Sequence, residues 1–231
     1  MIKGIIFDKD GTLFDFNATW GAWAGMMIRQ ETRGDAGKAA ALADAMGYDM
    51  KAERFLPCSV VIAATVEQTA QVMLNVLVGE TLQTLIPRMN AAAAALPQVQ
   101  AVPLIPYFDD LKARGLKLGI ATNDAEAPAI ANLQSAGIKD HFDFIAGYDS
   151  GYGGKPETGQ LRAFCQQTGL VAPDCVMVGD STHDLTAGKD AGMRAVGVLT
   201  GPAPAAELAP FADVVLQNIG DLPGWMDAEA L

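Results

Sequence analysis

The stretch IIFDKDGTLFD, Ile5 to Asp15, joins an apolar run to two aspartates and a Gly-Thr turn. Side chains along a strand alternate between its two faces. A strand over residues 3–7 that continues to Asp10 therefore puts Asp8 and Asp10 on one face and turns Lys9 away from them. Two carboxylates this close repel each other unless a cation or a proton neutralises one. The stretch predicts either a charged site at the strand end or a plain turn rich in Asp and Gly.

The segment that follows, from about residue 17 to 96, has the composition of helices. It is rich in Ala, Met, Leu and Gln, carries charges at helical spacing, and almost lacks the β-branched alternation of strands. We therefore predict an all-helical insertion over residues 15–97. The expected helix ends in this segment are Gly34, Gly47, Pro57, Gly79 and Pro97.

Beyond Pro103, short apolar runs alternate with helical segments, which predicts a doubly wound α/β fold with a parallel sheet between two helical layers. The expected strands cover residues 117–121, 142–147, 175–178, 194–198 and 213–216. The expected C-terminal glycines of the helices between them are Gly115, Gly137, Gly169 and Gly192. Because the first strand needs these later strands as partners, residues 1–14 and 98–231 should form one α/β domain that the insertion interrupts.

Residues capable of chemistry gather at the carboxyl ends of the expected strands, where open parallel sheets bind ligands. They are Asp8, Asp10, Thr122, Asn123, Lys155, Asp180 and Asp184. Each has an ordinary explanation by itself, such as a helix cap or a solvated charge. Their convergence on one sheet edge favours a single shared site.

In this order, the strand ends resemble the four motifs of the haloacid dehalogenase superfamily, in the branch with a helical cap inserted after the first motif. The segment DKDGT resembles the first motif, ATN the second, Lys155 the third and GDSTHD the fourth. The longer run GDSTHDLTAGKDAGM is similar to the phosphoglycolate phosphatases of this branch. The resemblance covers essentially the whole chain and implies a phosphatase that acts on a small phosphate monoester of the phosphoglycolate or sugar-phosphate type.

The resemblance also implies a role for each site residue. Asp8 would be the nucleophile that forms an aspartyl-phosphate, and Asp10 would protonate the leaving oxygen and then activate water. Thr122 and the backbone amides around Asn123 would bind the phosphoryl oxygens. Lys155 would orient the nucleophile and stabilise the transition state.

Magnesium is the cofactor that the resemblance implies. Its expected ligands are the Asp8 carboxylate, the Asp10 backbone carbonyl and the Asp180 carboxylate, since Mg²⁺ favours oxygen ligands. Asp184 shares a face with these residues if a helix begins near Ser181. It would then either hold a water of the metal or pair with Lys155, and the sequence does not choose between these.

Two charged residues inside the motifs receive no catalytic role. Lys9 stands where many relatives carry an apolar or aromatic residue, and we expect a structural ion pair and not a substrate contact. For His183 we expect a surface or packing role. The inserted cap would select the substrate, but its sequence favours no particular residue for that task.

Composition restricts the partners and the location. The net charge of −11 and the lack of a basic stripe argue against nucleic acid. The longest apolar-looking region, 59–79, is broken by polar residues and reads as amphipathic helix, not as a membrane span, and no apolar run of signal-peptide length precedes Asp8. Cys58, Cys165 and Cys175 lack metal-site spacing and are expected to be reduced thiols. We expect a cytoplasmic protein with a small phosphorylated substrate; the sequence leaves its oligomeric state open.

Three alternative functions remain at this stage. A phosphosugar mutase would use the same motifs. A haloacid dehalogenase would need neither Mg²⁺ nor Asp10, because it has no alkoxide to protonate. A phosphoacceptor receiver module also has a doubly wound sheet with acids, a threonine and a lysine, but it places its acceptor on a middle strand and has no counterpart of the insertion.

Overall fold

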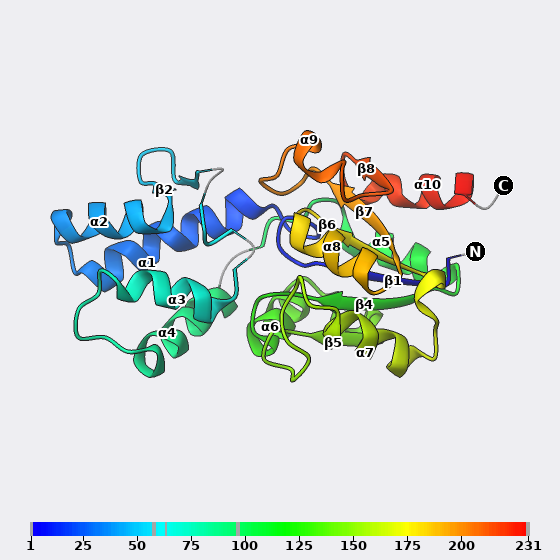
Figure 1. Cartoon of the computed structure of the whole chain (residues 1–231), viewed down its shortest axis with the longest axis horizontal. Helices are drawn as coiled ribbons and strands as arrows, with labels where there is room; N and C mark the ends of the chain where they lie inside the picture. Colours follow the sequence, from blue (N-terminus) through cyan, green and yellow to red (C-terminus); the bar gives the residue numbers. More distant parts are fainter. Residues whose placement is uncertain (1, 57–58, 63, 96–97, 230–231) are drawn as a thin grey trace.

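The parallel sheet is the centre of the molecule. The computed structural model describes residues 2–56, 59–62, 64–95 and 98–229 (Figure 1). Six parallel strands follow the order β5-β4-β1-β6-β7-β8, which confirms the predicted doubly wound fold. They are β1 (Gly4–Phe7), β4 (Lys117–Ala121), β5 (Phe144–Ala146), β6 (Cys175–Gly179), β7 (Arg194–Val198) and β8 (Val214–Leu216). Because β1 lies between β4 and β6, the end of β1 is flanked by two of the other predicted motifs.

Helices cover both faces of the sheet, and the side chains of β1 alternate between them. Ile5 and Phe7 pack with α5 (Leu104–Ala113), α6 (Glu126–Ser135) and α10 (Leu222–Glu229), whereas Ile6 packs with α7 (Gly159–Thr168) and α8 (Thr182–Asp190). Both layers are fully apolar at these positions, as expected for parallel strands buried on two sides. The domain also contains α9 (Ala205–Leu208) and the short 3₁₀ turns η2 (Lys139–His141), η3 (Ala172–Asp174) and η4 (Ile219–Asp221).

The predicted helix ends in this half of the chain are confirmed. Gly115, Gly137, Gly169 and Gly192 have φ angles of +79°, +72°, +72° and +80°. Each follows or caps the last residues of α5, α6, α7 or α8. This left-handed conformation costs a residue with a side chain energy that glycine avoids.

The first strand is shorter than the sequence predicts. β1 ends at Phe7, and the expectation that it continues to Asp10 is wrong. The chain instead folds into a tight loop, in which the amides of Leu13 and Phe14 both donate to the carbonyl of Lys9. Gly11 allows this turn with a φ of +80°. The alternation of side chains therefore does not extend past Asp8.

The insertion is a separate layer of helices beside one end of the sheet (Figure 1). Its helices are the π-helical turn η1 (Asn17–Gly21), α1 (Ala22–Thr32), α2 (Ala36–Met46), α3 (Val66–Leu74) and α4 (Leu82–Ala94). They share their own apolar core, which includes Trp23, Met27, Leu42 and Met73. Gly34 follows α1, Gly47 caps α2 and Gly79 lies in the turn after α3, whereas Pro57 and Pro97 lie outside the described residues.

One part of the insertion is not helical. β2 (Tyr48–Asp49) and β3 (Arg54–Phe55) pair as an antiparallel ribbon. The Asp49 carboxylate caps the turn between them by accepting from the amides of Lys51 and Ala52, and Glu53 adopts a positive φ of +50°. The predicted all-helical insertion is thus wrong over this stretch, because local turn chemistry overrides the helical composition.

The insertion leaves and re-enters the sheet domain through two adjacent chain segments. The amide of Asp15 donates to the carbonyl of Val99 at 2.8 Å, and that of Ala101 donates to the carbonyl of Leu13 at 2.9 Å. Phe14 and Gln100 pair as an antiparallel bridge between these bonds. We propose that this neck is the junction of the two domains, next to the boundaries expected at 14/15 and 97/98.

No helix within the described ranges is long and apolar enough to cross a membrane.

Cys165 and Cys175 are free thiols with their sulfur atoms 3.9 Å apart, so these two cysteines are neighbours in space. Cys58 lies outside the described residues.

The contact between β4 and α7 leaves no room for a side chain at Gly119. A Cβ there would lie 2.6 Å from Cδ2 of the buried Phe164 ring. We expect Gly119→Ala to lower the free energy of unfolding by about 1–3 kcal/mol, because the ring cannot move without opening the core. Chemical denaturation measures this change. The control is Gly224→Ala in α10, where no atom lies within 4 Å of the new Cβ and a helical alanine stabilises by up to about 1 kcal/mol.

Candidate active site

The seven residues that the sequence predicts for the site all border one pocket, between the carboxyl ends of the strands and the insertion. β1, β4 and β6 end beside one another, which explains why residues far apart in the chain meet there. The loop after β5 brings in Lys155. The convergence expected from the strand ends is therefore what the fold produces. The seven are Asp8, Asp10, Thr122, Asn123, Lys155, Asp180 and Asp184.

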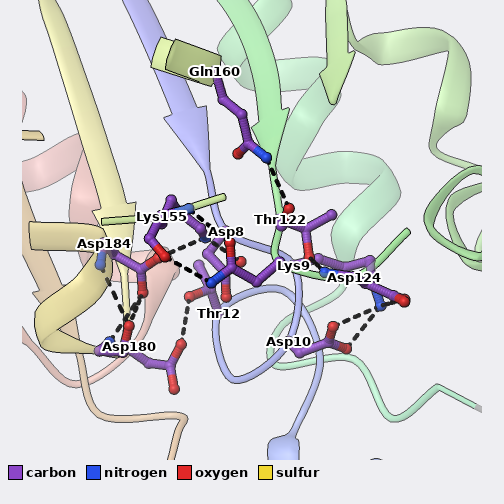
Figure 2. Close-up of polar contacts among 12 residues, drawn as sticks. Asp8, Lys9, Asp10, Thr12, Thr122, Asp124, Lys155, Gln160, Asp180 and Asp184 are labelled. Atoms are coloured by element: carbon purple, nitrogen blue, oxygen red, sulfur yellow. Dashed lines mark hydrogen bonds and ion pairs between the residues drawn. The ribbon is translucent and has the colours of Figure 1, made fainter. Parts of the chain in front are cut away.

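Lys155 joins two of the carboxylates. Its Nζ lies 2.6 Å from Oδ1 of Asp8 and 2.6 Å from Oδ1 of Asp184, and all three residues are buried (Figure 2). Burial by itself would lower the pKa of Lys155, but the carboxylates of Asp184 and Asp8 raise it above the usual lysine range. The ammonium ion therefore stays charged. Of the two possibilities left open for Asp184, the structure shows the ion pair with Lys155.

The main chain of Lys155 is fixed by Asn123. The Asn123 side chain accepts from the Lys155 amide at 2.8 Å and donates to its carbonyl at 2.9 Å. The Asn123 side chain thus positions the backbone of Lys155. Its backbone amide remains the group that we expect to contact phosphate.

Gln160 is a supporting residue that sequence reasoning missed. Its fully buried side chain donates to the carbonyls of Thr122, at 3.0 Å, and Gly153, at 3.1 Å. It thereby ties the end of β4 to the loop that carries Lys155. No local pattern marks Gln160, because this contact depends on how α7 packs on β4.

Asp184 is oriented by the start of α8. It forms a capping box with Ser181, whose side chain accepts from the Asp184 amide while the Asp184 carboxylate accepts from the Ser181 amide. The helix start expected near Ser181 is confirmed. Since Oδ2 of Asp184 serves the cap, Oδ1 is left to face Lys155.

Negative charge exceeds positive charge in this cluster. Asp8, Asp180 and Asp184 are three buried carboxylates with candidate ligand atoms within 4.8 Å of one another, and Lys155 is the one cation in contact with them among the described residues. Burial raises the pKa of Asp8 to about 7, against the opposing effect of Lys155. Burial and the charges of Asp8 and Asp184 also raise the pKa of Asp180 well above its usual range.

A cation would relieve this imbalance. A nucleophilic carboxylate must be ionised, and a hard divalent ion such as Mg²⁺ favours ionised oxygen ligands in a buried site. The donor set therefore fits the expected metal. Thr12, which sequence reasoning also missed, supports it: the buried hydroxyl donates to Oδ1 of Asp180 at 3.4 Å.

Thr122 presents a hydroxyl to the pocket. Its Oγ1 accepts from the amide of Asp124 at 3.0 Å, and a hydroxyl that accepts one bond retains a proton to donate. His183, in contrast, is exposed at the edge of the pocket, in keeping with the surface role expected for it.

Lys9 forms a second charged cluster, and its side chain points toward Asp10 and not away from it as the sequence predicts. Its fully buried ammonium lies 2.8 Å from both carboxylate oxygens of Asp10 and 3.5 Å from Oδ2 of Asp124 (Figure 2). It also donates to Oδ1 of Asn132 at 3.1 Å. The expectation of a structural ion pair is confirmed, but the expectation that Lys9 points away from the aspartate pair is wrong, since the chain leaves the strand before Lys9.

This cluster turns Asp10 away from Asp8 and toward Lys9 (Figure 2). Burial raises the pKa of Asp124 to about 6, although Lys9 opposes this effect. The carboxylates of Asp10 and Asp124 in turn raise the pKa of Lys9 against the effect of burial. The two ammonium ions, Lys155 and Lys9, thus hold Asp8 and Asp10 in separate environments.

Comparison with models of known protein families identifies the family of this chain. A model of the family described as haloacid dehalogenase-like hydrolase matches residues 5–198. The chain belongs to the haloacid dehalogenase-like hydrolases. The family resemblance is therefore confirmed, and the receiver-module alternative is excluded.

Among the haloacid dehalogenase-like hydrolases, the chain is similar in sequence to proteins named phosphoglycolate phosphatase and similar in fold to a β-phosphoglucomutase. The chain is 36% identical over 118 residues to a phosphoglycolate phosphatase of Rhodospirillum rubrum, and the match covers 50% of this chain and about half, 48%, of that relative. It is 31% identical over 242 residues to a phosphoglycolate phosphatase of Yersinia pestis, covering 99% of this chain and 97% of the relative. The crystal structure of β-phosphoglucomutase from Clostridium difficile has the same fold, with a TM-score of 0.68, 19% identity, and coverage of 96% of this chain and 93% of that one.

Removal of the Lys9 ammonium should be costly. We expect Lys9→Met to lower the free energy of unfolding by about 3–5 kcal/mol at neutral pH, because it leaves two largely buried carboxylates, those of Asp10 and Asp124, without their counter-ion. The control Lys3→Met removes an exposed pair with Asp174 and should change stability by less than about 1 kcal/mol. Equal effects of the two substitutions in chemical denaturation would contradict this account of Lys9.

Proposed function

We propose that the protein is a magnesium-dependent phosphatase that hydrolyses a small phosphate monoester through an aspartyl-phosphate on Asp8. The observation that carries this proposal is the buried contact of 2.6 Å between Lys155 and Asp8, at the floor of a pocket that Thr122 and Asp180 also line. The names of the curated relatives, phosphoglycolate phosphatase, support the same reaction class.

In the first half of the reaction, a carboxylate oxygen of Asp8 attacks phosphorus and the bond from phosphorus to the alcohol oxygen breaks. Lys155 and the Thr122 hydroxyl stabilise the charge on the other phosphoryl oxygens. Asp10 donates a proton to the leaving oxygen, so that an alcohol and not an alkoxide departs.

In the second half, Asp10 takes a proton from water, the water oxygen attacks phosphorus, and the bond to Asp8 breaks to release inorganic phosphate. The two halves use one residue as acid and then as base, so its position must be kept between them. The ion pair with Lys9, at 2.8 Å to both oxygens, gives Asp10 a fixed resting position in the pocket. Lys9 is thus a positioning residue.

Magnesium would be held by the Asp8 carboxylate, the Asp180 carboxylate and the Asp10 backbone carbonyl. When bound, it neutralises charge on the phosphoryl group and favours the ionised form of Asp8. Asp184 acts through Lys155, whose ammonium it contacts together with Asp8.

The alternatives within the family differ from this proposal in specific ways. A haloacid dehalogenase has no leaving alkoxide to protonate, so the Asp10 carboxylate in the pocket and its buried partner Lys9 support the phosphatase. A phosphosugar mutase must bind a polyhydroxylated ring, and the pocket wall opposite the carboxylates is mainly apolar. We also infer a cytoplasmic location, which the pair of free cysteines supports.

The nucleophile can be tested by hydrolysis of p-nitrophenyl phosphate with Mg²⁺. We expect Asp8→Asn to reduce kcat by about 10⁴-fold or more, because an amide oxygen does not form the covalent intermediate. The control Asp140→Asn changes a surface aspartate whose side chain is 96% exposed and should retain full activity. Turnover by Asp8→Asn at the rate of the parent protein would refute the assignment.

The metal site can be tested separately from turnover. We expect Asp180→Asn to weaken Mg²⁺ binding, measured by isothermal titration calorimetry, by about tenfold or more, because it removes a charged ligand. Asp190→Asn, an exposed residue at the end of α8, is the matched control. An unchanged dissociation constant for Mg²⁺ in Asp180→Asn would remove this residue from the ligand set.

A further inference from the structure

The pocket has two chemically different halves. The sheet edge supplies the carboxylates, Lys155 and Thr122, whereas the insertion supplies aromatic and aliphatic side chains. These come from η1, α1, β3, α3, α4 and neighbouring loop residues, so several elements of the insertion contribute to one apolar wall. Its members include Phe16, Trp20, Trp23, Phe55, Val66 and Met89.

This wall carries no cation among the described residues. None of the arginines and lysines of the insertion lines the pocket. Arg88 pairs with Glu31 and Glu80, and Arg29 pairs with Glu53 on the surface. The residues of the insertion outside the description are Pro57, Cys58, Ala63, Leu96 and Pro97, none of which bears a positive charge. A carboxylate on the leaving group would therefore be buried against apolar side chains without a counter-ion, which is strongly unfavourable.

Polar groups on the wall are few: the hydroxyl of Thr69 and the indole nitrogens of Trp20 and Trp23. The indole nitrogens of Trp20 and Trp23 are buried and have no hydrogen-bond partner within the described part of the chain. The two rings pack edge to face, with centroids 5.2 Å apart. Two N–H donors and one hydroxyl are too few to satisfy the several hydroxyls of a sugar, each of which donates as well as accepts.

The apolar wall meets the proton-transfer residue through Trp20. The Lys9 ammonium lies 5.7 Å from the centroid of the Trp20 ring and holds Asp10 by its other contacts. In the proposed reaction, Asp10 protonates the leaving oxygen. The group attached to that oxygen therefore lies next to Trp20, at the edge of the apolar wall.

From these observations we propose that the leaving group is a neutral alcohol with an aromatic ring, and not glycolate or a sugar. The inference rests on the proposed function and names the substrate class of the same site. It separates this chain from the phosphoglycolate phosphatases that it resembles in sequence, because an aromatic wall recognises flat apolar groups.

The test compares four phosphates of primary alcohols, so that the leaving oxygens are alike: benzyl phosphate, 4-carboxybenzyl phosphate, phosphoglycolate and glucose 6-phosphate. We expect kcat/KM for benzyl phosphate to exceed that for phosphoglycolate and for glucose 6-phosphate by about 100-fold. The added carboxylate should lower kcat/KM of the benzyl compound by about tenfold or more. A kcat/KM for phosphoglycolate or glucose 6-phosphate equal to or above that for benzyl phosphate would overturn the inference.

Substitutions in the wall locate the effect. Val66 is partly exposed at the start of α3, so Val66→Arg should fold, and Val66→Gln is its neutral control. We expect Val66→Arg, but not Val66→Gln, to raise kcat/KM for phosphoglycolate by about tenfold, since it supplies the missing counter-ion. Trp20→Ala should raise KM for benzyl phosphate by about tenfold. Trp225→Ala, in α10 at the far end of the molecule from the insertion (Figure 1), should leave it unchanged.

Binding to Asp8→Asn separates this inference from the proposed function. Calorimetry with intact benzyl phosphate and with phosphoglycolate needs no turnover. Tighter binding of benzyl phosphate by about tenfold or more supports the inference even if hydrolysis fails and the phosphatase proposal falls. Tighter binding of phosphoglycolate overturns the inference and leaves the phosphatase proposal standing.

Discussion

The ion pairs of Lys155 hold the candidate site together. Three carboxylates are buried at one sheet edge, and such a cluster is stable only with a counter-charge in contact. Lys155 supplies it from the loop after β5, and its backbone is in turn fixed by Asn123. The contacts that tie this loop down, from Asn123 and Gln160, therefore exist to keep one ammonium ion in place. One positive charge against three negative charges still leaves the cluster able to accept a metal.

A second ammonium ion gives the first two aspartates different surroundings. Asp8 faces Lys155 and Asp10 faces Lys9, although the aspartates are only two residues apart. Two carboxylates with opposite tasks need different surroundings. In this protein each has its own buried lysine, and the insertion covers the second of them with Trp20. Lys9, which we propose positions the proton-transfer residue, is thus in contact with the part of the chain proposed to meet the leaving group.

The sequence was sufficient for the sheet and for the residues at its edge. Strand and helix alternate with clear glycine stops, and parallel strands bring their carboxyl ends together, so Asp8, Thr122 and Asp180 could be placed without coordinates. Lys9 could not be, because the period of two holds only within a strand and β1 ends at Phe7. Gln160 carries no signal at all, since its hydrogen bonds join loops that are distant in sequence. The apolar wall could not be predicted for the same reason. The sequence of a helix shows which residues are apolar, but not which of them line a pocket.

The neck between the sheet domain and the insertion allows proteins of this architecture to differ in their insertions. The segments around Leu13 and Val99 leave the sheet hydrogen-bonded to each other, so the ends of the insertion are held together whatever lies between them. Closing a loop whose ends already meet costs little more entropy when the loop grows longer. An exchange of the whole segment for one of different length would leave the catalytic loop undisturbed. Replacement of the insertion can therefore change the proposed leaving-group wall while the proposed phosphoryl-transfer residues stay in place.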